Sequence, residues 1–138
     1  MAKPKIRHLA MFAREPEKVA AFYQEVFDME LIDSYHNGAG NAQFVSDGYI
    51  TIAILPHRLD GSAQVGLNHF GFLVEDSAEI REKITQRGLV DPMKRPADRI
   101  YAEYRGLDPE NNWFDISENG YDNRRPEADA IKRGKVTA

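Results

Sequence analysis

The order of apolar and polar positions along the chain repeats once. The first half is predicted to contain a strand at residues 6–12, a helix opened by Pro16, and strands at residues 29–35, 42–45 and 49–55. The second half is predicted to contain a strand at residues 67–74, a helix opened by a capping box at Asp76, and strands at residues 90–94, 100–105 and 113–117. Each half therefore follows the order strand, helix, three strands.

The repeat also holds at individual positions. A shift of 61 residues places His8 on His69, and the same shift places Val19 on Ile80. Small repeated units of this kind usually bury a joint core. We therefore predict two βαβββ modules at residues 1–56 and 67–120, a linker at residues 57–66 and a charged tail at residues 121–138.

Composition and charge exclude several classes of function. The 138 residues include 18 Lys and Arg against 22 Asp and Glu, so the net charge of −4 gives no basic face for nucleic acid. There is no cysteine, which excludes disulfides, thiolate ligands and a cysteine nucleophile. The chain has neither an apolar run of about 18 residues nor a signal-like start. We expect a cytoplasmic protein with no nucleic-acid or membrane partner.

Four segments carry a resemblance to a known family. They are residues 6–10, 20–29, 67–72 and 108–116. Together they resemble the vicinal oxygen chelate superfamily, which includes glyoxalase I, extradiol dioxygenases, methylmalonyl-CoA epimerase and the fosfomycin and bleomycin resistance proteins. The last segment is similar to the family's Asp-Pro-x-Gly-x-x-x-Glu-Leu signature, but Asn111 stands where glycine is usual and Asp115 where glutamate is usual. Asparagine still suits a left-handed turn position.

The resemblance implies a fold and an assembly. The fold is α+β, with two βαβββ modules forming an eight-stranded, incompletely closed barrel-like sheet, as in the glyoxalase, bleomycin resistance protein and dioxygenase fold. By the same resemblance the chain is expected to form a homodimer.

The resemblance also implies a divalent metal ion and a small-molecule substrate. Carried over position by position, His8 and His69 fall on the two histidine positions, and Asp115 falls on the carboxylate position of the second module. Aligning residues 52–54 with residues 114–116, an offset of 62, places Ala53 at the matching position of the first module, so one carboxylate remains. Two histidines and one carboxylate favour Fe(II) or Mn(II), with Zn or Ni as alternatives. The missing carboxylate favours dioxygenase-like chemistry.

Two other functions remain open. One is a lyase or isomerase of glyoxalase or epimerase type, and the other is a metal-free binding protein like those that sequester bleomycin. A histidine on a strand is often only a core residue, and Asp115 is an ordinary surface acid if its face of the strand is solvated. If that face lines a cavity, the carboxylate needs a cation beside it.

The other candidates are side chains that could contact a substrate. The substrate-binding candidates are Phe44, Tyr49, Tyr101, Tyr104, Arg105 and Trp113. His36 and His57 fall in predicted loops, where we expect them to be exposed. Together with Tyr104 they are the acid–base candidates, because imidazole titrates near neutral pH.

Overall fold

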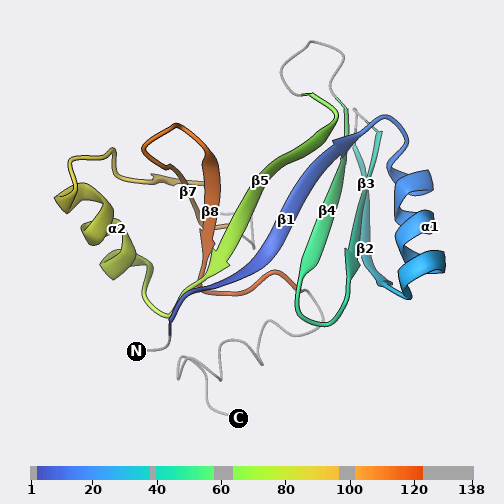
Figure 1. Cartoon of the computed structure of the whole chain (residues 1–138), viewed down its shortest axis with the longest axis horizontal. Helices are drawn as coiled ribbons and strands as arrows, with labels where there is room; N and C mark the ends of the chain where they lie inside the picture. The colour runs from blue at the N-terminus through green and yellow to red at the C-terminus, as the bar shows by residue number, and fades with distance from the viewer. Residues whose placement is uncertain (1–2, 38–39, 58–63, 97–101, 123–138) are drawn as a thin grey trace. The chain divides into compact units, whose positions relative to one another are not determined.

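The computed structural model describes residues 3–37, 40–57, 64–96 and 102–122 (Figure 1). The elements of the first half are β1 (Lys5–Ala13), α1 (Pro16–Phe27), β2 (Glu30–Asn37), β3 (Gly40–Ser46) and β4 (Thr51–Pro56). Those of the second half are β5 (Gly66–Leu73), α2 (Ser77–Gln86), β6 (Met93–Lys94), β7 (Tyr104–Leu107) and β8 (Trp113–Ser117). The predicted α+β class with two βαβββ modules is confirmed. The exact module, linker and tail boundaries remain predictions.

The strands follow the hydrogen-bonded order β2-β3-β4-β1-β5-β8-β7-β6. β1 pairs with β4, and β5 with β8, in parallel, while the hairpins β2–β3 and β7–β8 are antiparallel. The sheet is therefore mixed. It is also not closed, because the end strands β2 and β6 are not paired with each other in the described part of the chain. The chain divides into two compact units, residues 8–69 and residues 1–7 with 70–138, which we call the N-terminal and C-terminal units.

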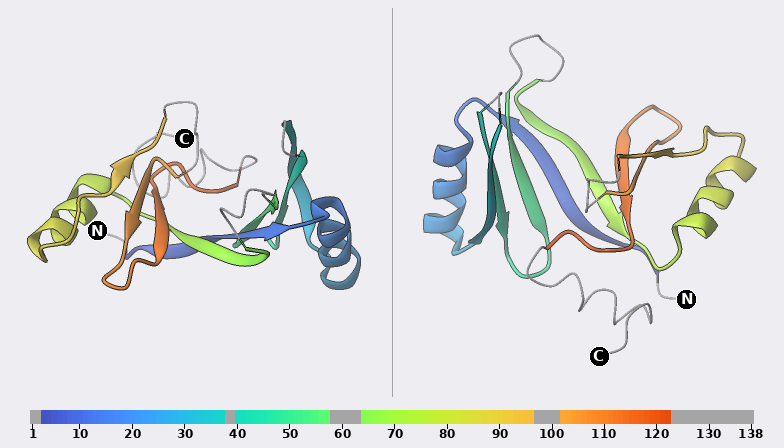
Figure 2. Two further views of the ribbon diagram at one scale, coloured as in Figure 1. Left: turned by 90° about the horizontal axis from the view of Figure 1, so that it is seen from above. Right: turned by 180° about the vertical axis from the view of Figure 1, so that it is seen from behind.

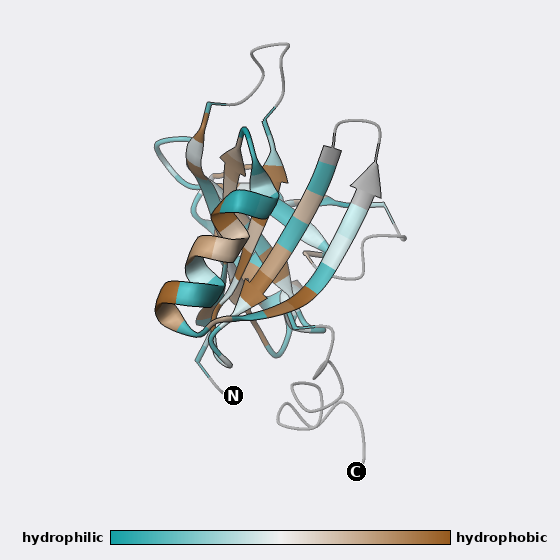
Figure 3. Cartoon of the chain, turned by 90° about the vertical axis from the view of Figure 1, so that its right-hand side faces the viewer, coloured by the Kyte–Doolittle hydropathy of each residue, from teal (hydrophilic) through white to brown (hydrophobic). Residues whose placement is uncertain are grey.

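The N-terminal unit has an apolar core under α1. Its fully buried members are Ala13, Ala20, Val45 and Ile54. α1 begins with Pro16, which suits the first helical turn, and packs on β3 and β4 (Figure 2). The outer side of α1 is also partly apolar, with Phe22 and Phe27 exposed, so brown and teal turns alternate along it in Figure 3.

The C-terminal unit holds its helix by polar contacts. None of the residues of α2 is buried. Asp76 caps the helix by accepting the N–H groups of Ala78 and Glu79, and the Glu118 carboxylate accepts the N–H of Ser77 at 2.7 Å. Neither α1 nor α2 has the length and apolar character needed to cross a membrane.

Several predicted boundaries differ from the structure. The strand predicted from Tyr49 begins at Thr51, because the Asp47 carboxylate accepts the N–H groups of Tyr49 and Ile50 and closes a turn there. The loop predicted at His36 is wrong, since His36 lies in β2 opposite Asn41. The strands predicted at 90–94 and 100–105 correspond to the shorter β6 and to β7, and residues 97–101 lie outside the described part.

Candidate functional site

Two buried histidines lie beside each other in the N-terminal unit. His8 is on β1 and His69 on β5, and their ring centroids are 5.5 Å apart at an angle of 49°. Nδ1 of His69 lies 2.7 Å from Oδ1 of Asn68. An amide oxygen only accepts, so Nδ1 is the donor in this contact and Nε2 is the ring nitrogen that could bind a metal.

The carboxylate candidate is buried in the C-terminal unit. Asp115 lies on β8 with 1% of its surface exposed, paired with Gly71 of β5 and Arg105 of β7. Nε of Arg105 donates to Oδ1 of Asp115 at 2.7 Å, and Nη2 donates to Oδ2 at 3.2 Å. Asp115 is therefore not a surface acid, and Arg105, one of the substrate-binding candidates, supplies a cation beside it.

A tight turn sets the register that brings Arg105 and Asp115 together. The Asp108 carboxylate accepts both the backbone and the side-chain N–H groups of Asn112, at 2.9 Å each. These bonds, the side-chain bond first, lower the pKa of Asp108. Asn111 has a φ of 64°, which confirms that asparagine takes the left-handed position expected for glycine.

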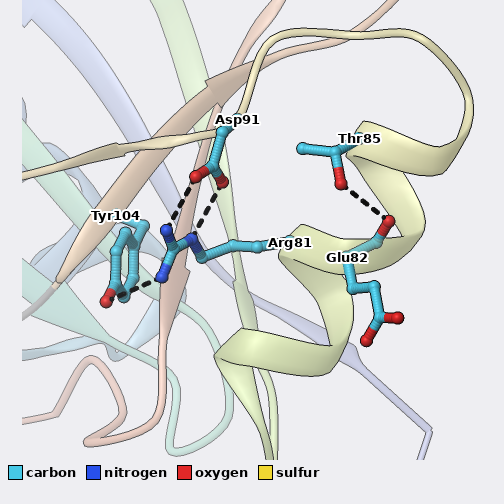
Figure 4. Close-up of polar contacts among 5 residues, drawn as sticks. All are labelled: Arg81, Glu82, Thr85, Asp91 and Tyr104. Atoms are coloured by element: carbon cyan, nitrogen blue, oxygen red, sulfur yellow. Dashed lines mark hydrogen bonds and ion pairs between the residues drawn. The ribbon is translucent and has the colours of Figure 1, made fainter.

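Tyr104 lies on the opposite face of β7 from Arg105. Its hydroxyl accepts a hydrogen bond from Nη1 of Arg81 at 3.2 Å, and the guanidinium carbon of Arg81 is 4.5 Å from the centroid of its ring (Figure 4). Arg81 also donates two hydrogen bonds to Asp91, at 2.7 and 2.9 Å. Tyr104 therefore contacts α2, and its role toward a substrate stays a prediction.

The other candidates are spread over both units. Trp113 is 46% exposed, and the Arg105 guanidinium carbon lies 5.3 Å from its ring centroid. Phe44 is half-buried on β3, Tyr49 is exposed in a turn and His57 is half-buried after β4, while Tyr101 lies outside the described residues.

Two residues that the sequence placed in the charged tail, Tyr121 and Asp122, are buried. Tyr121, assigned from the sequence to the charged tail, is buried, and its hydroxyl donates to the backbone carbonyl of Phe72 at 3.0 Å. Burial first, and then the nearby charges of Asp115 and Glu103, raise its pKa well above the ordinary value. An aromatic residue soon after the last strand was the signal in the sequence that could have identified it as part of the folded unit.

Comparison with known proteins gives a family and a fold. The model of the Glyoxalase/Bleomycin resistance protein/Dioxygenase superfamily matches residues 5–116. No curated protein matches the chain.

Three solved structures illustrate the likeness in fold. A hypothetical protein from Bacillus halodurans C-125 superposes with a TM-score of 0.63 and 14% identity, covering 84% of this chain and 94% of that one. A halotolerant catechol dioxygenase gives a TM-score of 0.63 and 17% identity, covering 86% of this chain but 40% of that one. A methylmalonyl-CoA epimerase from Mycobacterium tuberculosis gives 0.59 and 11% identity, with 81% and 85% covered. At these identities the likeness shows the fold alone.

Proposed function

Because the chain belongs to the glyoxalase/bleomycin resistance protein/dioxygenase superfamily, we propose that it is a metal-dependent enzyme whose ion is held by His8, His69 and Asp115. Each of the three is buried and offers one ligand atom. The observation that carries the proposal is that Asp115, a charged residue, is buried, whereas the equivalent position of the first half holds Ala53. Burying an ionised group costs free energy, and burying a small apolar side chain does not. We therefore infer that Asp115 has a chemical role in the site.

The donor set fits a borderline to hard divalent cation. It consists of two imidazole nitrogens and one carboxylate, in a chain without cysteine. We propose Fe(II) or Mn(II), with Zn or Ni as alternatives. Such an ion acts as a Lewis acid that orients two adjacent substrate oxygens, and Fe(II) also permits chemistry with O₂.

The residues around these donors prepare them for a ligand. The bond of Asn68 to Nδ1 of His69 makes Nε2 the nitrogen suited to a metal. Arg105 holds the plane of the Asp115 carboxylate, and each carboxylate oxygen has a second lone pair beyond the one directed at the guanidinium. A divalent ion can therefore bind this carboxylate, and its charge then competes with Arg105 for Asp115.

The reaction we propose is oxygenation of a small diol with adjacent oxygens. Ala53 supplies no second carboxylate from β4, so the first module has no acid at the position expected to move a proton in an isomerase. This favours dioxygenase-like chemistry over the lyase or isomerase alternative.

The test compares the two reaction classes on one preparation. We expect Fe(II)-loaded protein to consume O₂ with catechol, and we expect no isomerisation of the methylglyoxal–glutathione adduct. His69→Ala should abolish O₂ uptake, whereas Arg87→Gln, which changes an exposed side chain at the end of α2 outside every candidate set, should retain most of it. Isomerisation of the adduct without O₂ uptake would assign the protein to the lyase and isomerase class instead.

One observation favours a second candidate, a metal-free binding protein. Arg105 already neutralises both oxygens of Asp115, so this carboxylate is satisfied without an ion. In that case equilibrium dialysis would find no bound metal, and binding of a small aromatic ligand would be unchanged by EDTA.

We also propose that two copies of the chain associate, as the family resemblance implies. Light scattering on purified protein should give the mass of two chains, and the mass of one chain at micromolar concentration would contradict this.

A further inference from the structure

One face of the C-terminal unit combines a cation with exposed apolar side chains. In the antiparallel ladder Met93 lies opposite Arg105, and Arg105 opposite Asp115, so these three side chains share a face. Leu107 and Trp113 form the next row of the same face. Met93, Leu107 and Trp113 are 68%, 38% and 46% exposed. Three exposed large apolar side chains thus lie on the same face of the sheet as Arg105, and exposed apolar groups of this kind can mark a binding site.

This face is turned away from α2. Residues alternate along β7, so the contact of Tyr104 with Arg81 of α2 places Arg105 on the other side of the sheet. Within the described part of the C-terminal unit, α2 therefore leaves the patch of Met93, Leu107 and Trp113 uncovered, as the exposure of these side chains shows.

Arg105 connects the buried and the exposed parts of this face. Its side chain is 19% exposed, it binds the buried Asp115 through two donors, and its guanidinium carbon lies 5.3 Å from the centroid of the exposed Trp113 ring. A guanidinium is a planar fork that matches a carboxylate, and it also stacks on flat rings. Its position beside Trp113 therefore suits a ligand that combines a carboxylate with an aromatic ring.

We propose that Arg105 is a specificity-determining residue and that it selects a small aromatic carboxylate. The aromatic ring lies on Trp113, Met93 and Leu107, and the ligand's carboxylate replaces Asp115 as the partner of the guanidinium. This inference rests on the proposed function, because the bound divalent ion must draw the Asp115 carboxylate away from Arg105 before the ligand can take its place. The positive charge of Arg105 then adds to that of the ion, and an anionic ligand offsets part of this charge.

The test measures the preference for a carboxylate over its neutral amide. The probes are 3,4-dihydroxybenzoate and 3,4-dihydroxybenzamide, titrated by calorimetry into protein loaded with redox-inert Zn(II), whose metal content is measured on the same sample. We expect the acid to bind at least tenfold more tightly than the amide. Trp113 is the only tryptophan of the chain, so its fluorescence should change with the same affinity.

Variants separate recognition from folding. Arg105→Gln should reduce the preference to less than twofold, and Arg105→Lys, which keeps the charge but loses the fork, should leave an intermediate preference. The matched control is Arg87→Gln, which removes the same charge from the exposed end of α2 and should leave the preference unchanged. EDTA removes the metal, so Asp115 stays paired with Arg105, and the preference of the wild type for the acid over the amide should then fall below threefold.

The outcomes distinguish the two proposals. Metal-loaded protein that binds acid and amide equally, or Arg105→Lys that folds and keeps the full tenfold preference, overturns the inference and leaves the proposed function intact. A full preference in EDTA overturns the exchange of partners. Protein that takes up no metal overturns the proposed function and this inference together.

Discussion

The same strand position is filled by alanine in one half of the molecule and by aspartate in the other. Ala53 on β4 pairs with Ala10 of β1, and Asp115 on β8 pairs with Gly71 of β5, the residue 61 positions after Ala10. Both side chains are buried, at 3% and 1% exposure. The backbone requires no charge at this place, so the ion pair of Asp115 with Arg105 is a property of the second half alone.

The two helices also differ in how they are held, one by apolar packing and the other by polar contacts. α1 buries Pro16 and Ala20 against an apolar core, whereas α2 buries no residue and is held through Asp76, Glu118 and the pair of Arg81 with Asp91. The comparison indicates that the N-terminal unit is stabilised mainly by apolar packing and the C-terminal unit more by polar contacts. We therefore expect that removing apolar side-chain volume destabilises the N-terminal unit more, and that removing charged groups destabilises the C-terminal unit more.

The largest effect should come from matched deletions in the two halves. Ile54 and Ile116 directly follow Ala53 and Asp115, and both are buried. Ile54→Ala opens a cavity in the core of Ala13, Ala20 and Val45 and should lower the free energy of unfolding by about 4 kcal/mol, against about 2–3 kcal/mol for Ile116→Ala. Urea denaturation of both variants measures the difference, and a larger loss for Ile116→Ala would reverse the comparison.

Removal of the buried charge should have the next largest effect. Asp115→Asn leaves Arg105 without its carboxylate partner, and we expect a loss of about 2 kcal/mol in EDTA, near the low end for buried pairs because Arg105 is 19% exposed. The double variant Asp115→Asn with Arg105→Gln should recover part of the loss. Additive losses in this double-mutant cycle would show that the two side chains are not coupled.

A smaller gain is expected from relieving backbone strain beside β7. Ala102 has a φ of 58°, a left-handed conformation that costs a residue with a Cβ atom about 1 kcal/mol. Ala102→Gly should raise the free energy of unfolding by up to about 1 kcal/mol, whereas Ala10→Gly, in the middle of β1, should lower it. Thermal denaturation checks both signs, and a loss of stability in Ala102→Gly would contradict this account of the strain.

The smallest effect concerns pH and the turn that sets the register of β7 and β8. The pKa of Asp108 is lowered in the folded state. Its ionised carboxylate therefore stabilises the fold at pH values above the unfolded-state pKa of about 4, and this stabilisation is lost as the pH falls through the folded-state pKa. Asp108→Asn should lower the melting temperature slightly at pH 7. The difference from wild type should disappear near pH 2, and an undiminished difference there would exclude the charge as its cause.

Prediction from the sequence succeeded where one strand or helix determines the pattern. Alternation located β1 and β8, Pro16 located the start of α1, and the repeat placed Ala53 at the position in the first half that is equivalent to Asp115 in the second. The start of the strand predicted from Tyr49 was misplaced by two residues, because the Asp47 side chain closes a turn there that competes with strand pairing.

Contacts between strands were harder to predict than the strands themselves. The pair of Arg105 with Asp115 depends on the register that the turn at Asp108 imposes. Counting outward from that turn, with Leu107 opposite Trp113, would have placed Arg105 opposite Asp115. The exposure of Met93 and Leu107 depends on which face α2 covers, and periodicity within a short strand does not report this.

We propose that His8, His69 and Asp115 together hold a divalent metal ion. The direct measurement is the metal content, by mass spectrometry, of untagged protein exposed to Fe(II), Mn(II), Zn(II) or Ni(II) and then desalted. We predict one ion per chain in the wild type and in the control His57→Ala, and less than a tenth of this in folded His8→Ala, His69→Ala and Asp115→Ala. Folded wild-type protein without stoichiometric metal, or variants that keep it, would contradict the claim.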